Sequence, residues 1–192
     1  MFLGAVQFSV FLVVSESEYP GYSASRQPLS DLGATCSSKP CYIPPSATLF
    51  DSTVFMLGAL VFVAAFLVYI GRSRSVGGLL ALSSWGAMGV AIFPETTGIV
   101  HTLVSLITFL FGGLAAIWSF KVAKPPLGYF SVALGIMGLV ALVLYATGTY
   151  LGLGQGGMER MIVFPELLWL AALSVSFMTD TERERIPAPT PL

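Results

Sequence analysis

The sequence is poor in charged residues. Of its 192 residues only 10% are Asp, Glu, Lys or Arg, whereas 55% are hydrophobic, and the mean hydropathy is +0.84. Soluble domains carry about 25% charged residues, so a soluble domain could not cover its surface with this composition. The net charge of −1 gives no indication of nucleic-acid binding, and no basic run marks an anionic-lipid patch. The composition therefore predicts an integral membrane protein.

Histidine and cysteine are also scarce, with one histidine, His101, and two cysteines. Membrane zinc hydrolases need three histidines and a b-type haem normally needs two, so both classes are excluded. Cys36 and Cys41 lie in "CSSKPC", whose spacing differs from the C-x-x-C of redox proteins. We expect them to form a structural disulfide, with reactive thiols or metal ligands as alternatives. No cofactor is predicted.

Six apolar runs approach the roughly 20 residues that a membrane-spanning helix needs. They are Phe2–Val14 (continuing to about Ser17), Ser52–Ile70, Val76–Phe93, Gly98–Phe120, Leu127–Thr147 and Met161–Met178. Proline- and glycine-containing breaks separate them. The first run lacks a basic n-region and a cleavage site, so we expect a retained helix. These features predict an all-α polytopic membrane protein, with a six-helix transmembrane domain over residues 1–180, a loop over 16–50 and a short disordered tail over 181–192.

The basic residues predict the orientation of the bundle. Six of the nine lie at one end, which the positive-inside rule assigns to the cytoplasm. They are Arg72, Arg74, Lys121, Lys124, Arg183 and Arg185. Both termini are then cytoplasmic in the cell membrane. The first loop is extracytoplasmic, where an oxidising environment would allow the disulfide.

Acidic residues gather at the predicted outer end. Glu166 lies about a turn and a half into the predicted last helix, where an ionised acid costs about 2.5 kcal/mol or more at mid-membrane. It therefore needs a partner, water or a proton. Glu159 is seven residues earlier and shares its helical face. We expect these acids, Arg160 and Arg26 to form a cluster beneath the first loop.

A second stripe of polar and small residues follows the predicted fourth helix. His101, Ser105, Thr108 and Gly112 recur at helical spacing, so they should face the bundle interior rather than lipid. This places His101 toward the same outer pocket as Glu166. The remaining candidates for that pocket come from loops, and they are Tyr22, Ser30, Asp31 and Glu95.

Simpler structural roles remain open for several of these residues. Glu95 can favour the start of the next helix through its dipole, and His101 can be a hydrogen-bond donor that locks the bundle. Ser30 or Asp31 can cap a turn. Glu159 and Arg160 can be an ordinary interfacial ion pair. Glycine pairs in "GAMG" and "GIMG" are expected to be close-packing surfaces.

Three motifs carry a family resemblance: "YPGYS…R…LSDLG", "FPE…H" and "ER…VFPELLW". Their order at the outer ends of the predicted helices resembles the uncharacterised prokaryotic membrane family known as domain of unknown function 998. The resemblance covers nearly the whole chain. It implies the six-helix fold and its topology, but no activity. Members of that family have a longer first helix, so "MFLGAVQF" looks clipped.

Three functions are compatible with this sequence. The favoured hypothesis is a lipid-binding or accessory subunit with membrane lipids, and possibly other membrane subunits, as partners. One alternative is an outer-leaflet enzyme acting on a lipid or lipid-linked substrate, with Glu166, His101, Glu95 and Asp31 as acid–base candidates. A Ser30–His101–Asp31 triad is excluded because adjacent Ser and Asp cannot easily flank one imidazole. No metal is predicted, and His101 and Glu166 are the candidate ligands if one binds. The other alternative is a small proton-coupled transporter.

Overall fold

The protein is a bundle of six long helices. The computed structural model describes residues 1–34 and 41–185, the stretch 181–185 as backbone only, and this part of the chain contains no β-strand. The long helices are α1 (Phe2–Glu18), α2 (Ser46–Gly71), α3 (Arg74–Ile92), α4 (Ile99–Trp118), α5 (Leu127–Ala146) and α6 (Gly154–Arg185). Short 3-10 turns form η1 (Ser30–Leu32), η2 (Glu95–Thr97) and η3 (Ser119–Lys121).

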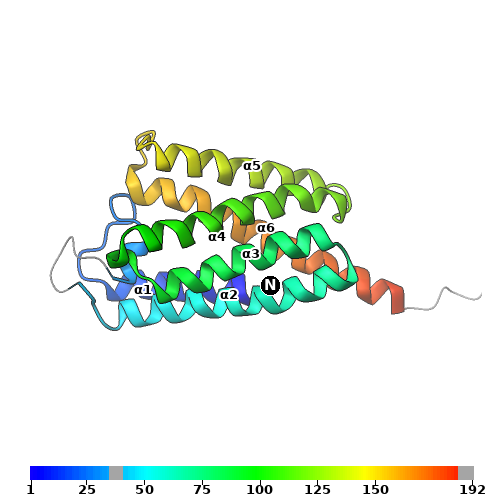
Figure 1. Cartoon of the computed structure of the whole chain (residues 1–192), viewed down its shortest axis with the longest axis horizontal. Helices are drawn as coiled ribbons and strands as arrows, with labels where there is room; N and C mark the ends of the chain where they lie inside the picture. The colour runs from blue at the N-terminus through cyan, green and yellow to red at the C-terminus, as the bar shows by residue number, and fades with distance from the viewer. Residues whose placement is uncertain (35–40, 186–192) are drawn as a thin grey trace, which may run out of the picture.

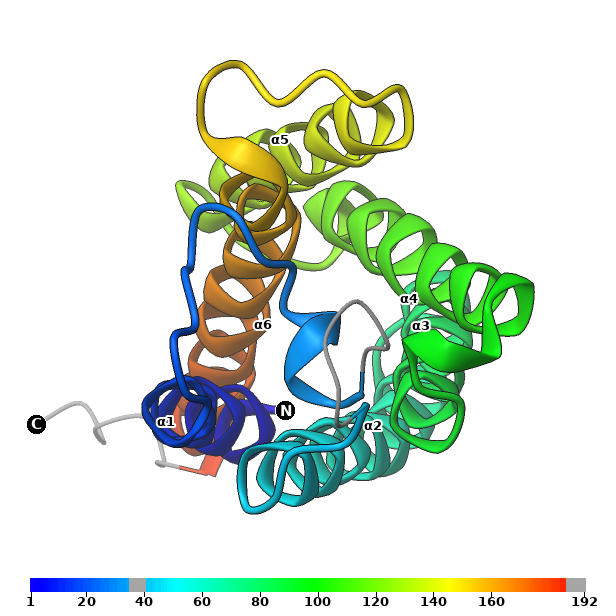
Figure 2. The same cartoon turned by 90° about the vertical axis from the view of Figure 1, so that its left-hand side faces the viewer.

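The helices are arranged as a ring in chain order. Contacts join each helix to the next from α1 to α6, and α1 closes the ring against α6. The end-on view in Figure 2 shows this ring, with the first loop folded over its centre. Three connections lie at one end of the bundle, named here the lid end; their described residues are 19–34 and 41–45, 93–98 and 147–153 (Figure 1). The other two connections and the last turns of α6 lie at the opposite end (Figure 1).

Five of the described helices are long and apolar enough to cross a membrane: α2, α3, α4 with η3, α5 and α6 up to Asp180. At 1.5 Å per residue, their 19 to 27 residues span about 28 to 40 Å. The first helix has 17 residues and begins part-way along the bundle (Figure 1). The predicted all-helical, multi-pass membrane bundle is therefore confirmed.

Small residues allow the helices to pack closely. A Cβ at Gly86 of α3 would lie 2.6 Å from the Thr108 backbone nitrogen, and one at Gly135 of α5 would lie 2.7 Å from the Gly113 carbonyl oxygen. Backbones this close leave no room for a side chain. The prediction that "GAMG" and "GIMG" are close-packing surfaces is confirmed.

The boundaries of two helices differ from the predicted ones. α2 begins at Ser46 rather than Ser52, and α6 begins at Gly154 rather than Met161. Both first turns contain polar or glycine residues, which interrupt the apolar pattern, and at α6 the N–H groups of Gly156 and Gly157 are satisfied by the Ser25 carbonyl. α6 also continues to Arg185, into the predicted tail, and residues 186–192 lie outside the described residues.

Candidate functional site: a cavity beneath the first loop

The first loop is attached to the start of α6 by its backbone. The N–H groups of Gly156 and Gly157 both donate to the Ser25 carbonyl, at 3.0 and 3.3 Å. These are donors that the first turn of a helix leaves without an internal partner. A Cβ at Gly156 would lie only 2.0 Å from the Gln27 carbonyl oxygen. The glycines of "GLGQGG" therefore let the loop backbone reach the helix.

Arg160 then binds the loop through its side chain. Its Nη1 donates to the Ala24 carbonyl at 2.7 Å and to the Gly156 carbonyl at 2.9 Å. Its Nη2 donates to the Tyr22 hydroxyl at 3.0 Å and forms an ion pair with Glu16 at the end of α1. One guanidinium thus joins α1, the first loop and α6, which is the multidentate geometry that arginine favours.

Glu159 supports the next part of the loop. Its Oε2 accepts the Leu29 backbone N–H, and the Ser30 N–H also bonds to this carboxyl group. The residue is only 8% exposed. Glu159 therefore satisfies backbone donors at the start of η1, which has no side-chain cap of its own. The expected cap from Ser30 or Asp31 is absent because Glu159 takes that role.

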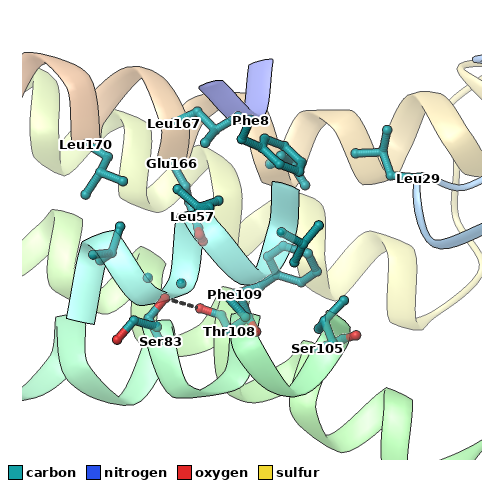
Figure 3. Close-up of a pocket in the computed structure, with 18 of the residues that line it drawn as sticks. Phe8, Leu29, Leu57, Ser83, Ser105, Thr108, Phe109, Glu166, Leu167 and Leu170 are labelled. Atoms are coloured by element: carbon teal, nitrogen blue, oxygen red, sulfur yellow. Dashed lines mark hydrogen bonds between the residues drawn. The ribbon is translucent and has the colours of Figure 1, made fainter. Parts of the chain in front are cut away.

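Beneath η1 lies a cavity of about 110 Å³ inside the ring of helices. Leu29 and Ser30 of the first loop line it, together with residues of α1, α2, α3, α4 and α6. Most of the wall is apolar. The polar side chains on the wall are Ser30, Ser83, Ser84, His101, Ser105, Thr108, Glu159 and Glu166. Figure 3 shows a hydrogen bond in the wall, from the Ser83 hydroxyl to the Thr108 carbonyl at 2.8 Å.

Glu166 extends from α6 into this cavity, toward Thr108 and Phe109 (Figure 3). Its carboxyl group packs against Gly112 of α4. A Cβ at Gly112 would lie 2.3 Å from Glu166 Oε2, so only a glycine leaves room for the carboxyl group there. The carboxyl also has a backbone hydrogen bond with Gly113. Its Oε1 is buried and has no hydrogen-bond partner. An unpaired polar atom in such surroundings is costly.

The position of Glu166 is deeper than the sequence indicated. Because α6 begins at Gly154, Glu166 lies about 18 Å along the helix, more than three turns from its start. The prediction of a turn and a half was wrong, since it took Met161 as the first residue. The predicted cluster of Glu166 with Arg160 and Arg26 is also wrong. Arg160 binds the loop, and Arg26 is exposed and donates to the Ser23 hydroxyl.

His101 lines the same cavity, but far from Glu166. Its Nδ1 bonds to the Phe93 carbonyl at 2.8 Å, which joins α4 to the end of α3. Along α4, His101 is 11 residues from Gly112, against which the Glu166 carboxyl packs, or about 16 Å. The two side chains cannot act on one atom or share one metal ion. Among the described residues, no group of three His, Cys, Asp or Glu side chains is placed to hold a metal ion.

Asp31 and Glu95 form a second acidic pair at the lid end. Their carboxyl groups are hydrogen-bonded to each other, and Asp31 is buried. Burial, which is the largest cause, together with the bond to Asp31 and the nearby charges of Asp31 and Glu159, raises the pKa of Glu95 to about 8. η2 and η1 therefore meet through a carboxyl pair that holds a proton near neutral pH. Glu95 does not cap α4, whose first residue follows Gly98 at a φ of +63°.

The chain matches the family described as "Protein of unknown function (DUF998)" over residues 2–176. It belongs to this family. The resemblance inferred from the three motifs is thereby confirmed. Neither the curated proteins nor the solved structures gave a significant match.

For this member of the DUF998 family, the structure gives the three motifs a common role. "YPGYS…R…LSDLG" supplies the loop that covers the cavity, "FPE…H" supplies Glu95 and His101, and "ER…VFPELLW" supplies Glu159, Arg160 and Glu166. Ser105 also lines the cavity, whereas Tyr22 lies in the loop network, where its hydroxyl donates to the Pro28 carbonyl at 2.9 Å. Burial raises the pKa of Tyr22 to about 12, so it remains a neutral donor. Cys36 lies outside the described residues, and its disulfide with Cys41 stays a prediction.

Sequence reasoning missed several residues of this site. The ion pair of Glu16 with Arg160 was not predicted, because it joins the end of α1 to α6. Ser83 and Ser84 of α3 face the cavity within an apolar run, and their spacing gave no separate signal. The four aromatic residues of the wall, Phe8, Phe50, Phe109 and Trp169, could not be told from ordinary core residues.

Proposed function

We propose that this protein is a lipid-binding or accessory subunit of the cell membrane that holds an apolar or amphiphilic membrane molecule in the cavity beneath the first loop. The observation that carries this proposal is an apolar-walled cavity with one buried carboxyl oxygen, Glu166 Oε1, that has no partner. Small-molecule sites are typically apolar cavities with a few placed polar groups. In the proposed orientation both termini are cytoplasmic and the lid end is extracytoplasmic.

The spacing of the polar groups favours binding over catalysis. General acid–base chemistry needs groups within hydrogen-bond reach of the same reacting atoms. Glu166 and His101 lie about 16 Å apart along the cavity wall, while Glu159 is occupied by backbone donors of the loop. The outer-leaflet enzyme and the proton-coupled transporter remain hypotheses without a specific structural observation in their favour.

A cavity-filling variant tests the proposal. Ser105 lines the cavity, whereas the adjacent Leu106 is 46% exposed on the outer surface of α4. Ser105→Phe should fill much of the cavity, and Leu106→Phe is the matched control. We expect a lipid-extract component to remain with the wild-type protein and with Leu106→Phe through purification, and to be absent from Ser105→Phe in native mass spectra. Equal retention by all three proteins would contradict binding in this cavity.

A further inference from the structure

We propose that the polar end of the bound molecule is a cationic amine, held by Glu166 and the aromatic wall. This inference rests on the proposed function and assigns the chemical class of its ligand. Three properties of the cavity carry it: the charges of its lining, the free oxygen of Glu166, and the aromatic side chains around it.

The charged groups of the lining have one sign. Two carboxyl groups, Glu159 and Glu166, reach the cavity, and no Lys or Arg is among its described lining residues. The nearest arginine along α6, Arg160, uses both terminal nitrogens on Glu16, Tyr22 and backbone carbonyls. An anionic head group would therefore meet acids without a counter-charge. A phosphate or a fatty-acid carboxylate is disfavoured.

Glu166 has the free capacity that a cationic donor requires. The Glu159 carboxyl is engaged by loop backbone N–H groups, whereas Glu166 Oε1 has no partner. A carboxylate in the hydrocarbon region is costly unless it is paired or neutralised, and an ammonium group supplies both the charge and the N–H donors. A ligand hydroxyl would satisfy the oxygen but not the charge.

The aromatic side chains suit the same ligand. Phe8, Phe50, Phe109 and Trp169 all line the cavity. Aromatic faces attract ammonium groups, and the attraction is larger when the cation is desolvated. The same faces accept the alkyl part of the molecule. The cavity therefore combines a carboxyl group with aromatic faces, and its described lining contains no Lys or Arg. Together these features favour an apolar amine.

The test compares octylamine, octanol and octanoate, which share one chain and differ in the polar end. Binding is measured on the full chain in nanodiscs by native mass spectrometry and by the concentration dependence of the thermal unfolding temperature. We expect octylamine to bind about tenfold more tightly than octanol, because its bond to Glu166 is charge-assisted, and octanoate to bind most weakly. Glu166→Gln should abolish the preference for octylamine and leave octanol binding unchanged.

A second pair of variants moves the carboxyl group without removing it. An added Cβ at Gly112 would lie 2.3 Å from Glu166 Oε2, at the flexible end of that side chain, so Gly112→Ala should displace the carboxyl and reduce the preference. Gly78→Ala is the control, because its Cβ would meet nothing within 4 Å. Equal binding of all three molecules, or tightest binding of octanol or octanoate, would overturn the amine inference while leaving the cavity as a lipid site. Binding of none of them would overturn both.

Discussion

The two ends of the bundle use charge in different ways. At the lid end, Glu159 is buried and accepts backbone N–H groups of the first loop, and Arg160, whose side chain is 13% exposed, bonds to the loop and to Glu16 of α1. At the opposite end, Asp180 pairs with Lys124 at 2.7 Å and Arg72 at 3.9 Å, and the Lys124 side chain is 74% exposed. Exposed ion pairs contribute little to stability, whereas buried groups that bond to a loop determine its path. The lid end therefore builds a cover over the cavity, whereas the opposite end pairs Asp180, whose side chain is 13% exposed, with a lysine that lies largely in water.

The largest expected effect tests the backbone attachment of this cover. Gly156→Ala places a Cβ 2.0 Å from the Gln27 carbonyl oxygen, whereas a Cβ at Gly78, near the opposite end, meets nothing within 4 Å. We expect Gly156→Ala to destabilise the protein by about 3 kcal/mol, as for other overpacked sites. Gly78→Ala should be neutral or slightly stabilising. Thermal unfolding in detergent measures the stability of both variants. Equal stability would contradict the proposed difference between the two ends of the bundle.

Removal of a guanidinium or an ammonium group should also distinguish the ends. Arg160→Ala leaves Glu16, the Tyr22 hydroxyl and the Ala24 carbonyl without this donor, and we expect a loss of about 2 kcal/mol. Lys124→Ala should change the unfolding free energy by less than about 0.5 kcal/mol, because that side chain is exposed. Hydrogen exchange should rise in the first loop of Arg160→Ala alone. A larger effect of Lys124→Ala would contradict this account.

A smaller effect is expected from the neutral variant of Glu159. Glu159→Gln keeps one carbonyl acceptor for the N–H groups of Leu29 and Ser30 but loses the charge that strengthens these bonds. We expect a loss of about 1 kcal/mol, with faster amide exchange at η1 and unchanged exchange in the η3 turn. Unchanged exchange at η1 would show that Glu159 does not support the loop.

The smallest predicted effect is a pH dependence confined to the lid end. The pKa of Glu95 is raised from 4.5 to about 8, so the folded protein keeps its proton over a range where the unfolded chain has lost it. This contribution to stability is complete below pH 4.5 and is lost as the pH rises toward 8. The protection factors of amides in the first loop, which are corrected for the base-catalysed rise of intrinsic exchange, should therefore fall from pH 6 to pH 9. The fall should be absent in Glu95→Gln, and an identical pH profile of the protection factors in that variant would assign the effect to Asp31 or Glu159.

The sequence predicted the parts of this molecule that depend on the bilayer. Apolar run length gave the helices, and the stripe of His101, Ser105, Thr108 and Gly112 correctly indicated the inner face of α4. Glu159 and Glu166 also lie on one inner face of α6, as their spacing required. These successes share a cause, because hydrocarbon excludes unpaired polar groups from the outer surface.

The parts that could not be predicted depend on backbone approaches between distant segments. The segment "GLGQGG" is one of the predicted breaks between helices, but it contains the first turn of α6. In that turn the N–H groups of Gly156 and Gly157 donate to the Ser25 carbonyl of the loop. This contact joins residues more than 120 positions apart, and no local pattern reports it. Because α6 begins at Gly154, Glu166 lies deeper in the bundle than predicted, and Arg160 bonds to the loop instead of to Glu166. Whether Arg160 bonds to carboxylates or to carbonyls depends on the path of the first loop, which sequence spacing does not indicate.

Glu166 lines the cavity with a carboxyl group of which one oxygen, Oε1, has no hydrogen-bond partner. Labelling with a hydrophobic carbodiimide, followed by peptide mass spectrometry, tests this placement most directly, because the reagent enters the bilayer and modifies carboxyl groups in apolar surroundings. We expect modification at Glu166 and little at Glu159, whose carboxyl is engaged by the loop. An unmodified Glu166 beside modified acids of the first loop would contradict the account.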